Sequence, residues 1–241
     1  MRESGVSIFR DCRLWNSPVF DAGFQCQLGA WQSQPPQAAA GDSESSLLIL
    51  PAAGTHYGFV QSGSLQLNCQ AGEFQLREGM YFAVPGSAEL RTEGTGFVAS
   101  RLDYSGFLHI GGPVEQAGRL RYIDGCSDSL LIPPVVLGDP CLNLLFLPPD
   151  TRQTRHTHPS CRLGIILSGH GICRTGAGEI ELQPGYVFHI PAQAEHSFHT
   201  DKQALRVIAW HPDSDCGPVH HNHPMINRTI IDGISAAGRR P

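Results

Sequence analysis

The sequence repeats itself at an offset of 106 residues, and this repeat constrains the fold more than any other feature. Residues 56–86 align with residues 162–192 without a gap. Matching residues include Gly58 with Gly164, Gly63 with Gly169, Gly72 with Gly178, Glu73 with Glu179, Gly79 with Gly185 and Pro85 with Pro191. Glycine at corresponding positions indicates that the same tight turns are needed twice. The chain is therefore predicted to contain two copies of one structural unit.

The segments between the glycines have the pattern of short strands. They are β-prone runs closed by glycine or proline, and no segment has a long helical period. The 27 glycines and 18 prolines also favour strands joined by turns. We expect an all-β fold of two tandem barrels, the first over residues 1–125 and the second over residues 126–215, followed by a tail over residues 216–241.

Composition and charge exclude several classes of protein. A chain of 241 residues with 41% hydrophobic residues is expected to be globular. The net charge of −5 argues against binding to nucleic acid or to an anionic membrane surface. The N-terminal stretch lacks the apolar segment of a signal peptide, and no run reaches the roughly 18 apolar residues of a membrane span. We therefore expect a cytoplasmic location, where the eight cysteines, none in a C-x-x-C pair, would be reduced.

Two histidines separated by one residue indicate a metal site in the second unit. His156 and His158 would alternate along a strand and point to one face. If His196 lies on a neighbouring strand, three neutral imidazoles converge, a ligand set that suits Fe(II), Zn, Ni, Cu or Mn. Two alternatives remain open: exposed loop histidines, or a decayed site that binds no metal.

The stretches around these histidines resemble the two motifs of the cupin family, G-x5-H-x-H-x3,4-E-x6-G and G-x5-P-x-G-x2-H-x3-N. His156, His158 and Gly169 match the first motif, and Gly185, Pro191 and His196 match the second. Four positions depart from the motifs: Asp150 and Gln193 replace glycines, Thr200 replaces the asparagine, and Arg162 replaces the glutamate. The resemblance implies a bicupin, two jelly-roll-type barrels in one chain, with one divalent transition metal ion.

Only the second unit keeps the metal-ligating residues. The offset of 106 places Leu50, Ala52 and Leu90 where the second unit has its three histidines. Leucine and alanine cannot bind a metal, so the interior of the first barrel is expected to be filled by side chains. The first barrel is then a structural or dimerising unit. A homodimer is expected, with the apolar run "MINRTIIDG" of the tail as a plausible contact.

Arg162 and His189 are the candidate catalytic residues. Three neutral imidazoles leave the full charge of the metal ion in place, and an inward Arg162 adds a second positive charge beside it. This arrangement is favourable when an anion lies between them, so we expect a small carboxylate substrate. The alternative is that Arg162 points outward or pairs with Glu195. His189 lies beside the second motif and is a candidate to support a metal ligand through a hydrogen bond or to act as a proton shuttle.

The resemblance and the ligand set together favour a mononuclear metal enzyme. A three-histidine site on a cupin resembles the sites of Fe(II) dioxygenases that act on thiols, β-diketones or gentisate-type ring acids. The leading hypothesis is therefore an Fe(II) dioxygenase with a small carboxylate substrate. One alternative is a Zn, Ni or Mn isomerase, lyase or hydrolase, including a zinc cupin of secondary metabolism. Another is a small-molecule sensor without catalysis.

Overall fold

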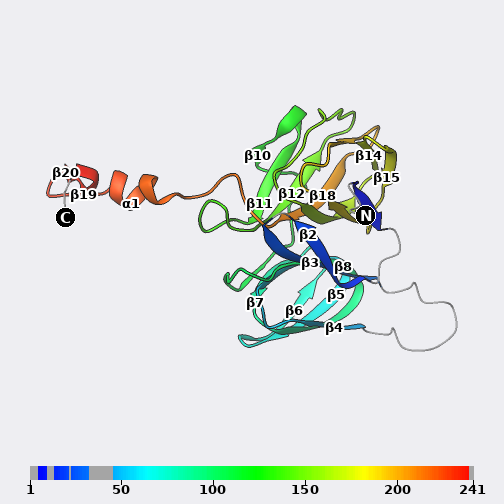
Figure 1. Ribbon diagram of the computed structural model, residues 1–241, viewed down its shortest axis with the longest axis horizontal. Coiled ribbons are helices and arrows are strands. Elements are labelled where there is room, and N and C mark those ends of the chain that lie inside the picture. Colours follow the sequence, from blue (N-terminus) through cyan, green and yellow to red (C-terminus); the bar gives the residue numbers. More distant parts are fainter. Residues whose placement is uncertain (1–4, 10–13, 22, 33–45, 239–241) are drawn as a thin grey trace.

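A computed structural model describes residues 5–9, 14–21, 23–32 and 46–238 of the chain, and the described residues form an all-β fold (Figure 1). In the first half an eight-stranded antiparallel sheet has the order β2-β3-β8-β5-β7-β9, with β4 paired to β8 and β6 paired to β5. Its strands are β2 (Leu14–Asp21), β3 (Phe24–Gln32), β4 (Ser46–Leu50), β5 (Thr55–Cys69), β6 (Gly72–Arg77), β7 (Tyr81–Pro85), β8 (Ala88–Arg101) and β9 (His109–Gly111).

The second half contains two further sheets. The larger has seven strands in the order β1-β16-β13-β18-β12-β11-β10, and the smaller has the order β15-β14-β17. The strands are β10 (Leu120–Arg121), β11 (Ser127–Ile132), β12 (Cys141–Leu147), β13 (Arg162–Ser168), β14 (Gly171–Thr175), β15 (Gly178–Leu182), β16 (Val187–Ile190), β17 (His196–His199) and β18 (Leu205–His211), with a single turn η1 (Ile123–Gly125) between β10 and β11. Among the described strands no sheet closes on itself into a barrel.

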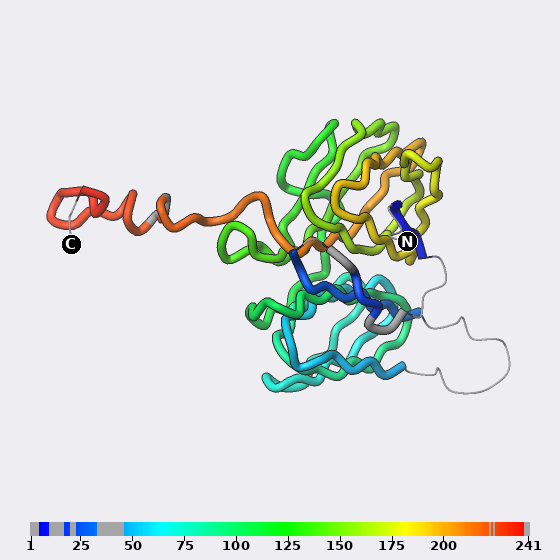
Figure 2. The backbone as a smooth tube through the Cα atoms, viewed as in Figure 1, coloured from blue at the N-terminus to red at the C-terminus, as the bar shows by residue number. Residues whose placement is uncertain are grey.

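The remaining strand of the seven-stranded sheet comes from the start of the chain. Strand β1 (Ser7–Phe9) pairs antiparallel with β16, with Ser7 opposite His189 and Phe9 opposite Val187. Figure 2 shows this N-terminal segment beside the second half. The sequence predicts that residues 1–125 form the first unit, but Ser7–Phe9 belong to a sheet of the second half.

The repeat seen in the sequence recurs in the backbone. Strands β6 and β7 begin 106 residues before β15 and β16, respectively. Gly63 and Gly169 have φ angles of 80° and 84°, in the left-handed region that favours glycine. A Cβ on Gly58 would lie 2.3 Å from the ring of Phe82, and a Cβ on Gly164 would lie 2.5 Å from the corresponding ring of Phe188. The matching glycines therefore serve the same packing in both halves.

A continuous apolar core joins the two halves. One face of the eight-stranded sheet packs against one face of the seven-stranded sheet, and residues of both sheets form a single buried cluster. Tyr57 of β5 and Trp210 of β18 meet in it with ring centroids 5.9 Å apart. Because apolar side chains of both halves are withdrawn from water in the same place, the two halves stabilise each other.

Each half also has a core of its own. In the first half, Leu50 and Leu90 are fully buried in an apolar cluster, so the positions that correspond to His156 and His196 are occupied by packed leucines. In the second half, the three-stranded sheet covers the other face of the seven-stranded sheet, with Phe188 and Phe198 between the two layers. The candidate site lies at one end of this second core.

The tail extends away from both halves (Figure 1). It contains η2 (His220–Asn222), α1 (Pro224–Asn227), η3 (Ala236–Gly238) and the strands β19 (Ile230–Ile231) and β20 (Ile234–Ser235), which pair with each other. Its large apolar side chains are exposed: Met225, Ile226, Ile230, Ile231 and Ile234. None of the helices in the described ranges has the length and apolar character needed to cross a membrane.

Candidate metal centre

Three histidines converge in the second half. The candidate ligand atoms of His156, His158 and His196 all lie within 4.8 Å of one another. His156 and His196 face each other in an antiparallel bridge, and the backbone N–H of each donates a 3.0 Å hydrogen bond to the carbonyl oxygen of the other. The carbonyl oxygen of His158 accepts a 2.8 Å hydrogen bond from the backbone N–H of Gln193. Backbone pairing of two chain segments therefore brings the three rings together.

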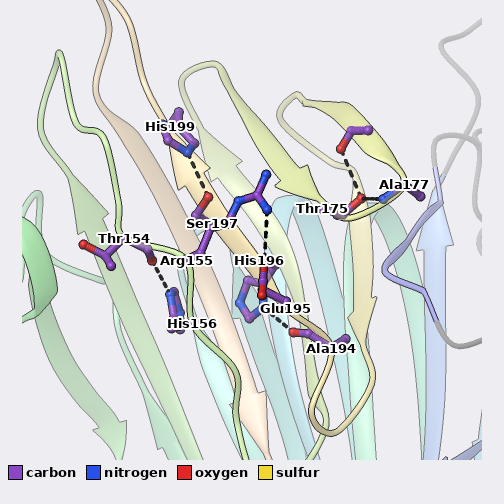
Figure 3. A network of polar contacts seen from close by, with 11 residues as sticks. Thr154, Arg155, His156, Thr175, Ala177, Ala194, Glu195, His196, Ser197 and His199 are labelled. Carbon is purple, nitrogen blue, oxygen red and sulfur yellow. Dashed lines mark hydrogen bonds and ion pairs between the residues drawn. The ribbon is translucent and has the colours of Figure 1, made fainter.

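Two of the rings are oriented by backbone carbonyls. Nδ1 of His156 lies 2.8 Å from the carbonyl oxygen of Thr154, and Nδ1 of His196 lies 2.9 Å from that of Ala194 (Figure 3). A carbonyl oxygen can only accept, so Nδ1 carries the proton in both rings. This leaves Nε2 of each ring with a free lone pair, the arrangement typical of metal-ligating histidines.

Burial keeps two of the three imidazoles neutral. It lowers the pKa of His158 to about 2, with a further contribution from the positive charge of Arg162. Burial also lowers the pKa of His196 to about 4. A metal can bind only the neutral ring, so at pH 7 these two residues need not release a proton to ligate it. The donor set therefore fits a divalent transition metal ion.

Arg162 faces the same cavity as the histidines. It is the first residue of β13, it is only 7% exposed, and it lines the cavity together with the three rings. Its Nη1 donates hydrogen bonds of 3.1 Å and 2.7 Å to the carbonyl and hydroxyl oxygens of Ser160, and one of 3.1 Å to the carbonyl of Cys161. The hydroxyl of Ser160 in turn donates to a carboxylate oxygen of Asp213. The guanidinium is thus held in place from one side.

Glu195 does not compensate the charge of Arg162. Its carboxylate pairs with Arg155 at 2.9 Å on the exposed surface, as Figure 3 shows. Burial lowers the pKa of Arg162, and the negative charges of Asp213 and Asp215 oppose that shift. Cys161, one residue earlier, packs in the apolar core between the halves, so the chain alternates as a strand does.

The cavity that contains these groups has a volume of about 170 Å³ and a mixed lining. One part of the wall is apolar and comes from Leu145, Phe188, Ile190, Phe198 and Ala209, with Tyr122 beside them. The polar part comes from the three histidines, Arg162, Asn143, Gln153, His211, Asp215 and Cys216. A small molecule with an anionic group and an apolar body matches this lining.

The structure does not bring His189 to the cavity. Its neighbours in β16, Phe188 and Ile190, line the cavity, and successive residues of a strand point to opposite faces. Val187, on the same face as His189, packs in the core between the halves. His199 likewise follows the cavity-lining Phe198 and bonds to Ser197 at 2.9 Å instead of joining the metal cluster.

Several lining residues are absent from the candidates of the sequence analysis. Asn143 lies on β12, before the first motif, and Asp215 and Cys216 follow β18. His211 ends β18; its Nε2 lies 2.8 Å from Sγ of Cys141, and burial lowers its pKa to about 3. No local pattern distinguishes these residues, because only the pairing of β12 with β11 and β18 places them around the cavity.

Comparison with known proteins identifies the class of the fold. Residues 143–211 match the cupin domain family model. No curated protein matches the sequence. Among solved structures, a cupin 2 conserved barrel domain protein from Leptotrichia buccalis is 10% identical and has a TM-score of 0.55, with 88% of this chain and 91% of that chain covered.

Two other structures have the same fold. Protein YlbA from E. coli is 18% identical, with a TM-score of 0.56 over 90% of this chain and 94% of that chain. Salicylate 1,2-dioxygenase from Pseudoaminobacter salicylatoxidans, solved as adducts with gentisate, is 10% identical, with a TM-score of 0.55 over 78% of this chain and 68% of that chain. The family match over residues 143–211 and the shared fold support membership of the cupin superfamily, and the three-histidine cluster suggests a metal site.

Proposed function

We propose that this chain is a metal-dependent cupin enzyme that acts on a small carboxylate, with Fe(II) as the favoured ion and dioxygenation as the favoured reaction. His156, His158 and His196 would hold one ion, with Nε2 as the ligand atom of His156 and His196. The observation that carries the proposal is that Arg162 lines the same cavity as the three histidines. A cation beside a site of neutral ligands is favourable when an anion binds between the two.

The residues that line the cavity have different proposed roles. The guanidinium of Arg162, fixed through Nη1 by Ser160, would bind the substrate carboxylate and orient the substrate, which turns binding energy into proximity. Phe188, Ile190 and Phe198 would contact the apolar part of the substrate and exclude water. A bound divalent ion would supply a Lewis acid and, in the case of iron, reactivity with O₂.

Two alternatives use the same site differently. Zn, Ni or Mn in the same ligand set would support a non-redox isomerase, lyase or hydrolase. A barrel that binds a small molecule without metal would be a sensor. The fold neighbour solved as adducts with gentisate, an anionic ring compound, supports the first proposal over these two, although the fold alone hosts many reactions.

We also propose that the two halves are two cupin barrels that divide near residue 125, with Ser7–Phe9 added to the second, and that the chain forms a homodimer. The recurrence of strands and glycines at one offset supports the first statement. The exposed apolar residues of the tail, among them Met225 and Ile230, support the second.

Metal analysis tests the proposed function. The protein is purified without a histidine tag and under anaerobic conditions, and metal is measured per chain for the wild type and for His196→Ala. About one iron per chain, lost in the variant, would support the proposal and leads to O₂-uptake assays with small carboxylates. One zinc or nickel would favour non-redox chemistry. No metal in either protein would reject the enzyme and leave the sensor.

A further inference from the structure

Asn143 lines the cavity and has a buried hydrogen-bond acceptor that no described residue uses. It lies on β12, is only 8% exposed, and lines the same cavity as Arg162 and the histidines. Its Nδ2 donates hydrogen bonds of 3.2 Å and 3.0 Å to the two carboxylate oxygens of Asp128. Its Oδ1 is buried and accepts no hydrogen bond from any residue that the structure describes. A buried acceptor without a partner costs stability unless a bound molecule supplies the donor.

The orientation of this amide follows from its neighbour. An ionised carboxylate only accepts hydrogen bonds, so Asp128 can bind the NH₂ end of Asn143 but repels the oxygen end. Burial raises the pKa of Asp128, and the hydrogen bond from Asn143 opposes that rise. The carboxylate therefore fixes the orientation of the amide, and Oδ1 is the end of the amide that does not face Asp128.

The other amide of the cavity has the opposite polarity. Oε1 of Gln153 accepts a 3.0 Å hydrogen bond from the backbone N–H of Phe198, so the outer end of Gln153 is its NH₂ group. Two residues adjacent to Asn143 on this wall are apolar: Leu145, two positions later on β12, and Ala209, the partner of Asn143 on β18. A molecule in the cavity can therefore supply the donor that Oδ1 of Asn143 lacks among the described residues.

We propose that Asn143 is a specificity-determining residue whose Oδ1 accepts a hydrogen bond from a hydroxyl or amino group of the substrate. The substrate class is then a carboxylate that also bears an O–H or N–H donor. This inference rests on the proposed function, because it takes the cavity as the substrate site. Arg162 binds the anionic group and Asn143 discriminates in favour of molecules that carry the donor.

Binding of matched ligands tests the proposal without turnover. Protein loaded with Zn²⁺ is titrated in a calorimeter with the three hydroxybenzoates, lactate, their O-methyl counterparts, and benzoate. For at least one pair, the wild type is expected to bind the hydroxy acid about tenfold or more tightly than its methyl ether, because the ether leaves Oδ1 without a donor. Wild-type affinities within twofold for every pair would overturn the proposal.

Two variants separate this hydrogen bond from chelation of the metal by the hydroxyl. Asn143→Leu removes the acceptor and is expected to bring the ratio for that pair to within about twofold of unity, with the zinc content unchanged. Asp128→Asn lets the amide turn and present its NH₂ end, so the ratio is expected to fall here too. A ratio that stays at the wild-type value in both variants would show that Asn143 does not select the substrate.

The failure of this inference is distinguishable from failure of the proposed function. Benzoate carries no donor, so its binding, and the loss of that binding in Arg162→Gln, report only on the anion site. If benzoate binds and Asn143→Leu leaves every ratio unchanged, the function stands and this inference is rejected. If no carboxylate binds, the same comparison is made with the neutral pair phenol and methoxybenzene. Tighter binding of phenol by the wild type that is lost in Asn143→Leu would support the inference. Equal binding of the two compounds by the wild type would reject it.

Discussion

His156 and His196 hold each other through two reciprocal backbone hydrogen bonds of 3.0 Å, which join the segment before β13 to the start of β17. Their ring centroids lie 4.6 Å apart. Because both residues are fixed through the backbone, the separation of their rings does not depend on a bound ion. The site is thus preorganised for a metal, and a ligand substitution removes a donor without removing this bridge.

The position of His199 provides a matched control for the metal site. His196→Ala is expected to abolish stoichiometric metal binding, because two imidazoles remain where three are needed. His199 lies three residues later on the same strand, and its side chain bonds to Ser197 instead of joining the cluster. The variant His199→Ala is therefore expected to keep the wild-type metal content. Metal analysis after dialysis measures both. Equal loss in the two variants would contradict the assignment of the ligands.

Arg162 is expected to determine the affinity for anions and not the retention of metal. Arg162→Gln removes the charge-assisted hydrogen bonds to a carboxylate, and we expect about a 10- to 100-fold weaker affinity for a bound carboxylate. Metal content should be at least that of the wild type, since a positive charge beside the ion is removed. Calorimetry with benzoate and metal analysis measure the two effects. An unchanged affinity for benzoate would mean that the guanidinium does not contact the anion.

Gly164 is expected to be essential for packing in the second half. A Cβ at this position would lie 2.0 Å from the carbonyl oxygen of Ile208 and 2.5 Å from the ring of Phe188. Gly164→Ala is expected to destabilise the protein by about 3 kcal/mol. At Gly176 no atom lies within 4 Å of an added Cβ, so Gly176→Ala is the control and should be close to neutral. Thermal unfolding compares the two, and equal melting temperatures would contradict the close approach of the strands.

Stability is expected to decrease in acid because buried histidines must be protonated on unfolding. Burial lowers the pKa of His56 from its ordinary value of 6.5 and that of His211 to about 3. Below pH 6.5 the unfolded chain therefore binds protons that the folded chain does not, and the free energy of unfolding falls, by at most about 1.4 kcal/mol per pH unit for each residue. Urea titrations of metal-free protein from pH 7 to pH 5 measure this.

His56 allows that loss of stability to be assigned to a residue. Its Nε2 donates to the carbonyl of Pro51 at 3.0 Å, and its Nδ1 lies 2.7 Å from the hydroxyl of Ser100. His56→Gln replaces it with a group that does not titrate, so the variant should lose less stability than the wild type over the same pH range. Parallel curves for the two proteins would exclude a contribution from His56.

Removal of the tail tests the proposed dimer. Truncation after Pro218 deletes the exposed apolar residues Met225, Ile226 and Ile230 but keeps Asp215 and Cys216 in the wall of the cavity. We expect the full chain to be dimeric and the truncated chain to be monomeric, with the metal content unchanged. Light scattering after size-exclusion chromatography measures the mass. A dimer that survives truncation would place the interface elsewhere.

The parts of the fold and of the site that follow from a local sequence pattern were predictable. The glycines at a constant offset predicted the matching strands, since turns of the same geometry require glycine in both copies. The spacing of His156 and His158, together with the second motif, predicted a cluster that the structure brings together. The orientation of His189 was also predictable from the alternation of side chains along β16. Phe188 and Ile190 on either side of it are apolar and point into the second half, so His189 has to point to the opposite face.

The rest of the site depends on pairing between distant segments. Asn143 lies at the cavity because β12 pairs with β18, and Asp128 on β11 orients its amide. No spacing in the sequence reveals either relationship. The inward position of Arg162 depends on Ser160 and on Asp213, more than 50 residues further along the chain. Such contacts are long-range, so a pattern within one segment does not contain them.

The pairing of β1 with β16 sets a condition on biosynthesis. Residues Ser7–Phe9 leave the ribosome long before their partners Val187–His189, by an interval on the order of ten to forty seconds at ordinary translation rates. During that time the eight-stranded sheet can form, while β1 still lacks its partner strand β16. Completion of the half that contains the three histidines thus depends on a segment translated long before the rest of its sheet, and a bulky group attached beside Ser7–Phe9 would interfere at a point remote in sequence from the histidines.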